Sequence, residues 1–312
     1  MIYLVFVGGL VLLVGGAELL IRGSVVAAQR LRLSPLIIGV VLVGFGTSSP
    51  ELVASVTAAL QNSPGIAIGN VVGSNICNVL LILAIGALIR PLPTQPRTVV
   101  RDGSAVLVAT VGFIAVCYLG LISRPIGAVL LVALTTYLVW CYRSDQHVVD
   151  DLGEAPASMS FAAALLLALL GLAGLIGGAY LLVEAAISLA RQFGVSETVV
   201  GLSVVALGTS LPELAATVVA VMRGHSDVAF GNVIGSNIYN ILGILGVTAL
   251  VHPIAVPSDL MGDDIWIMLA STVAMVVFAV TGRRISRWEG GVLLLAYVGY
   301  VSYLMETATS AS

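Results

Sequence analysis

Apolar runs about 20 residues long recur from one end of the chain to the other. That length matches the ~30 Å hydrocarbon core of a bilayer, crossed at 1.5 Å of helix rise per residue. Only 9% of the residues are charged, whereas a soluble globular domain carries roughly 25%. The sequence therefore predicts an all-α polytopic membrane protein. The ten expected transmembrane helices are residues 2–21, 36–60, 65–89, 100–122, 125–142, 160–190, 195–221, 227–251, 263–281 and 288–306.

The basic residues predict the orientation of these spans. All 13 of them are arginines, and with the N-terminus outside only Arg124 and Arg191 would lie on the outer side. Short inside loops are enriched in arginine and lysine. We therefore expect both termini outside and the central linker in the cytoplasm, in a plasma (inner) membrane.

The chain contains an internal repeat. The segment "GFGTSSPELVAS" at 44–55 has a counterpart, "ALGTSLPELAAT", at 206–217, and "GNVVGSNICN" at 69–78 matches "GNVIGSNIYN" at 231–240. Both pairs have the same offset of 162 residues (206 − 44 and 231 − 69). Five spans per half is an odd number, so the second half enters the membrane from the opposite side, as is common in secondary transporters. The predicted divisions are a first repeat at 1–142, a linker at 143–159, a second repeat at 160–306 and a tail at 307–312.

Glu51 and Glu213 lie inside predicted spans at equivalent positions of the two repeats. An ionised carboxylate at the bilayer centre costs at least ~2.5–3.5 kcal/mol on insertion scales. No span interior supplies an arginine as a partner, and protonation stays open because burial disfavours the charged form of a carboxyl group. We interpret the two residues as ligands of a cation held between the halves.

A proline and two hydroxyl residues precede each of these glutamates. The proline lacks a backbone N–H, so the helix should break or kink there, and carbonyl oxygens of unwound backbone can bind cations. The threonine lies four residues before the glutamate and shares its helix face. The hydroxyl ligands expected from these stretches are Thr47 and Ser48 in the first repeat and Thr209 and Ser210 in the second.

A second polar stretch follows in the next span of each half. Its Asn, Ser and Asn residues are spaced i, i+4, i+8, which places them along one stripe of a helix. We expect the Ser and the last Asn of each stripe to face the glutamates. Asn75 and Asn237 lie off the stripe and are interpreted as polar contacts between helices. The stripes are Asn70, Ser74 and Asn78, and Asn232, Ser236 and Asn240.

Oxygen atoms alone would line such a site, and hard cations such as Ca²⁺ and Na⁺ prefer all-oxygen shells. The three histidines lie in loops or at span ends, and the three cysteines lack metal-binding spacing, so zinc and copper are not expected. Two carboxylates neutralise one Ca²⁺ or two Na⁺, which makes the two loads competitors for one site. Glu18 is expected to pair with Arg22, four residues further along its helix, outside the site.

These paired motifs resemble the α1 and α2 repeats of the sodium/calcium exchanger family, within the calcium:cation antiporter superfamily. The resemblance covers nearly the whole chain and implies alternating access, in which the first and sixth helices slide across the other eight. It implies that Glu51 and Glu213 are shared central ligands. It implies an inner-side sodium site at Thr47, Ser74 and the Gly44 carbonyl, and an outer-side one at Thr209, Ser236 and the Ala206 carbonyl. It implies that the middle is completed by Ser48, Ser210, Asn78 and Asn240.

The chain departs from the family pattern in two ways. Asn78 and Asn240 are both amides, whereas some relatives carry an aspartate at the position of Asn240, so potassium co-transport is not expected. The central linker is short and lacks the large calcium-sensing domains of animal exchangers.

Three functions remain in competition. Na⁺-driven Ca²⁺ antiport leads, and Ca²⁺/H⁺ exchange is the nearest alternative because buried carboxylates can carry protons. A cation channel lined by Glu51 and Glu213 is a third. An enzyme is not expected, since no span interior offers a histidine base or an H-E-x-x-H motif. No cofactor and no nucleic-acid partner are expected beside Ca²⁺, Na⁺ and the lipid bilayer, and the oligomeric state is left open.

Overall fold

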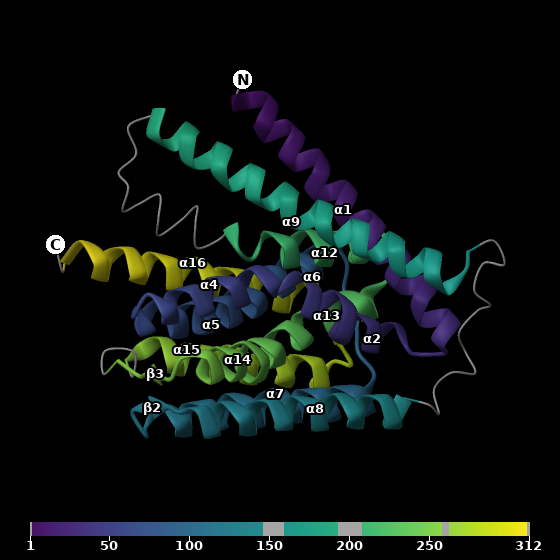
Figure 1. The fold of residues 1–312 in the computed structure, drawn as a ribbon. Helices are drawn as coiled ribbons and strands as arrows, with labels where there is room; N and C mark the ends of the chain where they lie inside the picture. Colours follow the sequence, from purple (N-terminus) through teal and green to yellow (C-terminus); the bar gives the residue numbers. More distant parts are fainter. Residues whose placement is uncertain (1, 146–158, 193–207, 258–261, 311–312) are drawn as a thin grey trace.

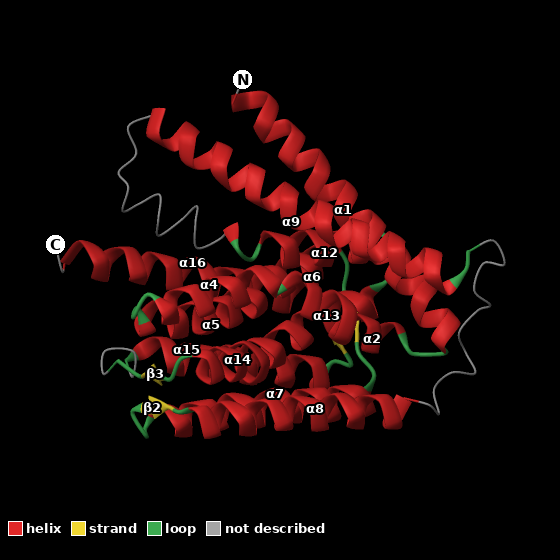
Figure 2. Ribbon diagram, viewed as in Figure 1, coloured by secondary structure: helices red, strands yellow, loops and turns green. Residues whose placement is uncertain are grey.

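The computed structural model describes residues 2–145, 159–192, 208–257 and 262–310, and these residues are almost entirely helical (Figures 1 and 2). The helices of the first half are α1 (Ile2–Leu31), α2 (Pro35–Ile38), α3 (Phe45–Thr47), α4 (Ser49–Leu60), α5 (Pro64–Cys77), α6 (Ala84–Ile89), α7 (Pro96–Cys117) and α8 (Arg124–Asp145). Those of the second half are α9 (Phe161–Gln192), α12 (Leu211–Met222), α13 (Ser226–Ile238), α14 (Leu245–Val251), α15 (Asp263–Thr281) and α16 (Arg287–Ser310). Within the described residues, three π-helical segments interrupt them: η1 (Gly39–Gly44), η2 (Asn78–Leu83) and η5 (Tyr239–Ile244).

Seven of the described helical runs are long and apolar enough to cross a membrane, and eight if the bent run over residues 39–60 is one span. The helical, multi-pass class predicted from the apolar runs is therefore confirmed. Helix α16 and α12, the described part of the seventh expected span, are not among the seven, so the number ten stays a prediction. Helix α1 is longer than the predicted span 2–21, because the apolar window closes at Arg22 while the helix continues to Leu31.

Helices α1 and α9 lie side by side and cross one side of the bundle diagonally (Figure 1). Gly9 of α1 lies against Leu182 of α9, and Gly23 lies against Ala168, so the two helices are antiparallel. A Cβ atom at Gly23 would lie 2.5 Å from the backbone nitrogen of Ala168. Glycine is therefore required for this close backbone approach, as is typical of helix pairs in membranes.

The remaining helices form a stack beside this pair, in which the two halves of the chain interlock. Helix α13 packs against η1, α8 against α14, and α16 against α6. Two short antiparallel ribbons also join the halves: β1 (Leu92–Pro93) pairs with β4 (Arg284–Ile285), and β2 (Leu121–Ile122) pairs with β3 (Ile254–Ala255). Each half thus completes the packing of the other.

The runs α5–η2–α6 and α13–η5–α14 are the most enclosed of the span-length helical runs that the structure describes. Apolar side chains in the middle of these runs, among them Val71, Ile76, Val233 and Ile241, are fully buried. These two runs also carry the asparagine stripes. The core of the bundle therefore holds the polar motifs away from lipid.

Candidate cation site

The helical run that carries Glu51 is broken in front of that residue. It bends by 48° at Ser48, between α3 and α4, and Pro50 lies in the first turn of α4, where a missing N–H breaks no intrahelical hydrogen bond. The backbone angles of Ser48 (φ −81°, ψ 8°) nearly match those of Ser210 (φ −87°, ψ 3°), which precedes α12 and its Pro212. The break expected at the first motif is confirmed. Whether a helix precedes the second motif lies outside the described residues, which resume at 208.

Both glutamates lie in the first turn of a helix and are buried, with 1% of Glu51 and 2% of Glu213 exposed. The Ser48 hydroxyl donates a hydrogen bond to Glu213 Oε1 at 2.9 Å. Because Ser48 stands three residues before Glu51, this bond joins the two motifs at one place in the interior. The partial positive charge of a helix N-terminus favours a carboxylate there.

Asn70, the first residue of the first stripe, holds the turn that carries Glu51. Its Nδ2 donates to the Glu51 backbone carbonyl at 3.0 Å and to Ser55 Oγ at 2.9 Å. Ser55 was not singled out from the sequence. A signal was present, because Ser55 lies four residues after Glu51 and has a hydroxyl residue at the 162-residue offset.

Asn232 repeats this arrangement in the second half. Its Nδ2 donates to the Glu213 backbone carbonyl at 3.3 Å and to Thr217 Oγ1 at 2.9 Å. Its Oδ1 accepts a hydrogen bond from Thr47 Oγ1 at 3.4 Å. Asn232 therefore connects its own glutamate to the hydroxyl motif of the other half.

The Gly44 carbonyl lies at the end of η1 and accepts hydrogen bonds from two of the expected hydroxyl ligands. Thr47 Oγ1 donates to it at 3.3 Å and Ser236 Oγ at 3.5 Å. The resemblance groups Ser236 with the outer-side site, but here its hydroxyl points to the carbonyl of the inner-side group. One hydroxyl from each half thus converges on this carbonyl.

The other expected ligands are placed unevenly. Ser74 and Ser210 are buried, whereas Thr209 is half-buried. Ala206 lies outside the described residues. Its carbonyl stays a prediction.

Asn78 is the first residue of the π-helical segment η2 and Asn240 the second residue of η5, and both are buried. Asn78 Nδ2 donates to Asn237 Oδ1 at 2.9 Å, and Asn240 Nδ2 donates to Asn75 Oδ1 at 3.0 Å. Asn75 and Asn237 do connect helices, as interpreted from the sequence. Their partners are the two amide ligand candidates, which that interpretation did not anticipate. Single π-helical turns are common at functional sites, yet hydrophobic periodicity gives no signal for them.

Four buried oxygens of the expected ligands have no hydrogen-bond donor among the described residues: Glu51 Oε2, Glu213 Oε2, Asn78 Oδ1 and Asn240 Oδ1. They form two pairs related by the 162-residue offset. A buried acceptor without a partner costs about 1–3 kcal/mol, and more if it is charged. Four such acceptors, two of them carboxylate oxygens, create a region of negative electrostatic potential that a bound cation would stabilise.

The available ligand atoms are oxygens. The described residues contain no group of three or more His, Cys, Asp or Glu side chains that could hold a metal ion, and the three cysteines are buried and free. The donor set consists of carboxylate, amide, hydroxyl and carbonyl oxygens. Such a set suits Ca²⁺ or Na⁺ rather than a soft transition metal.

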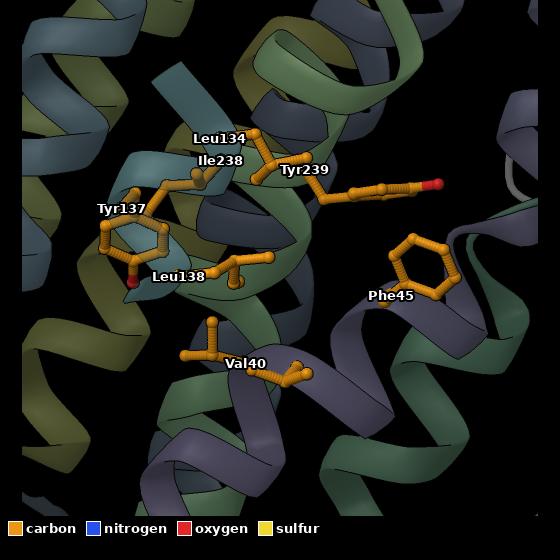
Figure 3. Close-up of a pocket in the computed structure, with 9 residues that line it drawn as sticks. Val40, Phe45, Leu134, Tyr137, Leu138, Ile238 and Tyr239 are labelled. Atoms are coloured by element: carbon orange, nitrogen blue, oxygen red, sulfur yellow. The ribbon is translucent and has the colours of Figure 1, made fainter. Parts of the chain in front are cut away.

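An apolar pocket of about 250 Å³ lies beside η1 and is distinct from this donor set (Figure 3). Tyr239 and Phe45 lie at one side of it with ring centroids 4.5 Å apart. Tyr137 lies at the other side, and its hydroxyl donates to Asp102. None of the cation-ligand candidates in the described part of the chain lines this pocket.

Span-length apolar helices packed around a polar interior define a multi-pass integral membrane protein. More particularly, the chain belongs to the family of the sodium/calcium exchanger protein, whose model matches residues 1–143 and 163–305. The matched segments include both polar motifs of each half. Membership in the family suggested by the motifs is therefore confirmed.

Relatives and solved structures resemble the chain over nearly its full length. It is 37% identical to CaxA of Alkalimonas amylolytica over 308 residues, covering 95% of this chain and 96% of the relative. It is 34% identical to the sodium/calcium exchanger MaX1 of Methanosarcina acetivorans, covering 97% and 98%. A structure of the sodium-calcium exchanger NCX_Mj soaked with 10 mM Na⁺ and zero Ca²⁺ matches with a TM-score of 0.85 and 30% identity, covering 97% of this chain and 99% of that one. The fold and family therefore support antiport of cations, Ca²⁺ among them.

Proposed function

We propose that this protein is a secondary active antiporter that exchanges Ca²⁺ for Na⁺ across the plasma (inner) membrane. The observation that carries the proposal is the set of four buried oxygens without donors, contributed equally by Glu51, Asn78, Glu213 and Asn240. A bound cation would compensate all four. The chain has no enzymatic activity and needs no cofactor in this proposal.

The charge of the site accounts for exchange. The two carboxylates carry −2 when ionised, which one Ca²⁺ or two Na⁺ neutralise. If one Ca²⁺ and two Na⁺ occupied the site together, it would hold excess positive charge in a low-dielectric interior, which is costly. Ca²⁺ and Na⁺ therefore replace one another, and net movement of one drives the other.

The burial and contacts of the described candidates, together with family membership, support the following assignment of ligands. Glu51 and Glu213 act as the central ligands, and Ser48, Ser210, Asn78 and Asn240 surround them. Thr47, Ser74 and the Gly44 carbonyl form one Na⁺ site. Thr209, Ser236 and the Ala206 carbonyl form the other.

Alternating access uses the helix pair α1 and α9. Among the described residues, the closest contact of α1 is with α9, through glycines, and the pair touches the rest of the bundle over a narrower surface that includes α12 and η1. A pair held together more tightly than it is held to the bundle can move as one unit. We propose ten spans in two inverted repeats, with both termini outside and the linker at 143–159 in the cytoplasm.

Flux measurements in sealed proteoliposomes test the function. Vesicles loaded with Na⁺ and diluted into Na⁺-free medium should take up ⁴⁵Ca²⁺, and collapse of the Na⁺ gradient should abolish the uptake. Glu51→Gln and Glu213→Gln should each abolish it, whereas Glu184→Gln, a change on the exposed face of α9, should not. If ⁴⁵Ca²⁺ uptake does not depend on the Na⁺ gradient but is driven by an imposed pH gradient, Ca²⁺/H⁺ exchange replaces the proposal.

A channel is separated from an antiporter by the same vesicles. A channel would pass Ca²⁺ down its own gradient without a counter-ion, and planar bilayers would show unitary conductance steps. Uptake that requires Na⁺ on the opposite side of the membrane contradicts a channel.

A further inference from the structure

Two hydrogen bonds cross between the halves of the chain at the level of the ligand amides. Asn78 donates to Asn237 and Asn240 donates to Asn75, at 2.9 and 3.0 Å. The two bonds are equivalent, since both donors and both acceptors are related by the 162-residue offset (240 − 78 and 237 − 75). All four side chains are 1% exposed. The arrangement is therefore a reciprocal pair of contacts in the dry core.

An asparagine side chain can offer a cation only one of its two ends. Its oxygen attracts a cation, whereas its NH₂ group has no lone pair to offer and carries positive partial charge. In Asn78 and Asn240 the NH₂ group is bound to a neighbour, and the oxygen has no donor among the described residues. A half-turn of either amide would bring two carbonyl oxygens together and turn NH₂ toward the ligand position.

The partner amides are themselves held in one direction. Asn237 Nδ2 donates to the backbone carbonyl of Asn75 at 3.5 Å, and Asn75 Nδ2 donates to Met268 Sδ at 3.7 Å. A carbonyl and a thioether can accept hydrogen bonds but cannot donate them. Each chain of bonds therefore starts at an atom that only accepts and ends at a free amide oxygen of Asn78 or Asn240.

We propose that Asn75 and Asn237 are positioning residues that hold the Asn240 and Asn78 amides with their oxygens toward the transported cation. This inference rests on the proposed function, because it assigns the two free oxygens to the cation. Asn75 and Asn237 do not touch the cation in this arrangement. They act through the neighbouring amide of the opposite half, so each half orients one ligand of the other.

A double-mutant cycle tests the connection. The half-saturating Ca²⁺ concentration of ⁴⁵Ca²⁺ uptake is measured for the wild type, Asn237→Ala, Asn78→Ala and the double variant. Each single change should raise it about 10-fold, the effect of losing one well-made interaction in a binding site. The double variant should be no worse than Asn78→Ala, because Asn237 acts only through Asn78. If the half-saturating Ca²⁺ concentration of the double variant rises by the product of the two single increases, the proposal is overturned.

The chain supplies its own matched control. Asn75 has the same residue type and burial as Asn237, but its side chain serves Asn240. In a second cycle, Asn75→Ala and Asn78→Ala should therefore show multiplying losses. Non-multiplying losses in both cycles would indicate a general packing effect and would also overturn the proposal.

Met268→Leu provides a variant of similar volume if the alanine variants fail to fold. It removes the thioether acceptor of Asn75 and keeps an apolar side chain. It should raise the half-saturating Ca²⁺ concentration in the wild-type background and leave it unchanged in the Asn240→Ala background. An equal rise in both backgrounds contradicts the positioning role.

Failure of the proposed function gives a different result. The cycles can be read with uptake driven by either a Na⁺ or a pH gradient, so proton coupling would overturn the Na⁺ assignment and leave the positioning test intact. A wild-type protein that takes up no Ca²⁺ under either gradient overturns both proposals. If the wild type transports Ca²⁺ but the increases in half-saturating Ca²⁺ concentration caused by Asn237→Ala and Asn78→Ala multiply in the double variant, only the positioning role is overturned.

Discussion

The Ser48 hydroxyl donates a 2.9 Å hydrogen bond to Glu213 Oε1, between residues 165 positions apart in the chain. Ser48 belongs to the same motif as Glu51, so a hydroxyl of one half satisfies a carboxylate oxygen of the other. This contact joins the two repeats at the bend that precedes α4. The candidate site is therefore a product of both halves and cannot form in either alone.

Ser48→Ala should weaken Ca²⁺ binding. The change removes the donor to Glu213 and one of the oxygens assigned to the site, and hydrogen bonds to charged groups contribute about 1.5–3 kcal/mol. We expect the half-saturating Ca²⁺ concentration to rise at least about 10-fold. The hydroxyl of the neighbouring Ser49 donates to the backbone carbonyl of Phe45 and not to Glu213. Ser49→Ala is therefore a matched control and should change the half-saturating Ca²⁺ concentration little. Equal effects of the two variants would contradict the contact.

Asn232→Ala should destabilise the protein more than Asn70→Ala. Asn232 is 1% exposed and contacts Glu213, Thr217 and Thr47. Asn70 is only partly buried and contacts Glu51 and Ser55. Each buried polar group left without a partner costs about 1–3 kcal/mol. Thermal unfolding in detergent without Ca²⁺ measures the difference.

Thr217 supplies the control for that comparison. Thr217→Ser keeps the hydroxyl that accepts from Asn232 and should retain most of the stability, while Thr217→Val removes it and keeps the shape. If Thr217→Val is as stable as Thr217→Ser, the hydrogen bond to Asn232 contributes little.

The parts of the structure that follow from local chemistry could be predicted from the sequence. Pro50 lacks an N–H, and the helix does break at Ser48 in front of it. The length of α1 could not be read from its first apolar run, because that run ends at Arg22 while residues 23–31 continue the helix, which ends only before Arg32, whose φ is +54°. Hydropathy shows where apolar residues recur, and it does not show where a helix ends.

The contacts that cross between the halves were harder to predict. The repeat indicates which residues are equivalent but not which residues touch, so the sequence predicts Asn75 and Asn237 as helix contacts without identifying their partners. Glu18 was expected to pair with Arg22, its neighbour along the helix. Its partner is instead Arg223 at the end of α12, at 2.8 Å. Helix periodicity cannot anticipate a partner that tertiary packing brings from the other half.

Asp102→Asn should be strongly destabilising. Arg101 Nε lies 2.6 Å from Asp102 Oδ1, and both residues are buried near the start of α7, at the edge of the predicted span 100–122. Removing one partner of a buried ion pair leaves an uncompensated charge and costs about 3–5 kcal/mol. The comparison is Glu18→Gln, which breaks an exposed pair and should cost about 1 kcal/mol or less. Similar unfolding temperatures for the two variants would show that Arg101 is solvated by headgroups or water.

Acidic pH should reduce stability in part through His225, in the turn between α12 and α13. Burial lowers the pKa of its imidazole below the ordinary value, although the carboxylates of Asp227 and Glu18 oppose this shift. Arg22 and Arg223 line the same pocket as His225. The folded protein therefore binds fewer protons than the unfolded chain below about pH 6.5. The contribution of neutral His225 to the free energy of unfolding is present above that pH and is lost as the pH falls.

Unfolding temperatures at pH 7.5 and 5.5 measure this contribution. The His225→Asn variant should lose less stability on acidification than the wild type, because asparagine takes up no proton. An identical loss in both proteins would assign the pH dependence to other groups.

Gly16→Ala should separate α1 from α9. A Cβ atom at Gly16 would lie 2.3 Å from the backbone nitrogen of Leu175 and 2.7 Å from the Gly171 carbonyl oxygen, and backbone atoms of a packed helix cannot move aside. Overpacking of this kind costs about 1–3 kcal/mol. Gly15 has open space around the same position, so Gly15→Ala should be neutral or slightly stabilising through its better helix propensity. If both variants unfold at the same temperature in detergent and in lipid, α1 and α9 do not approach at Gly16, and the proposal that they move as one unit loses its structural basis.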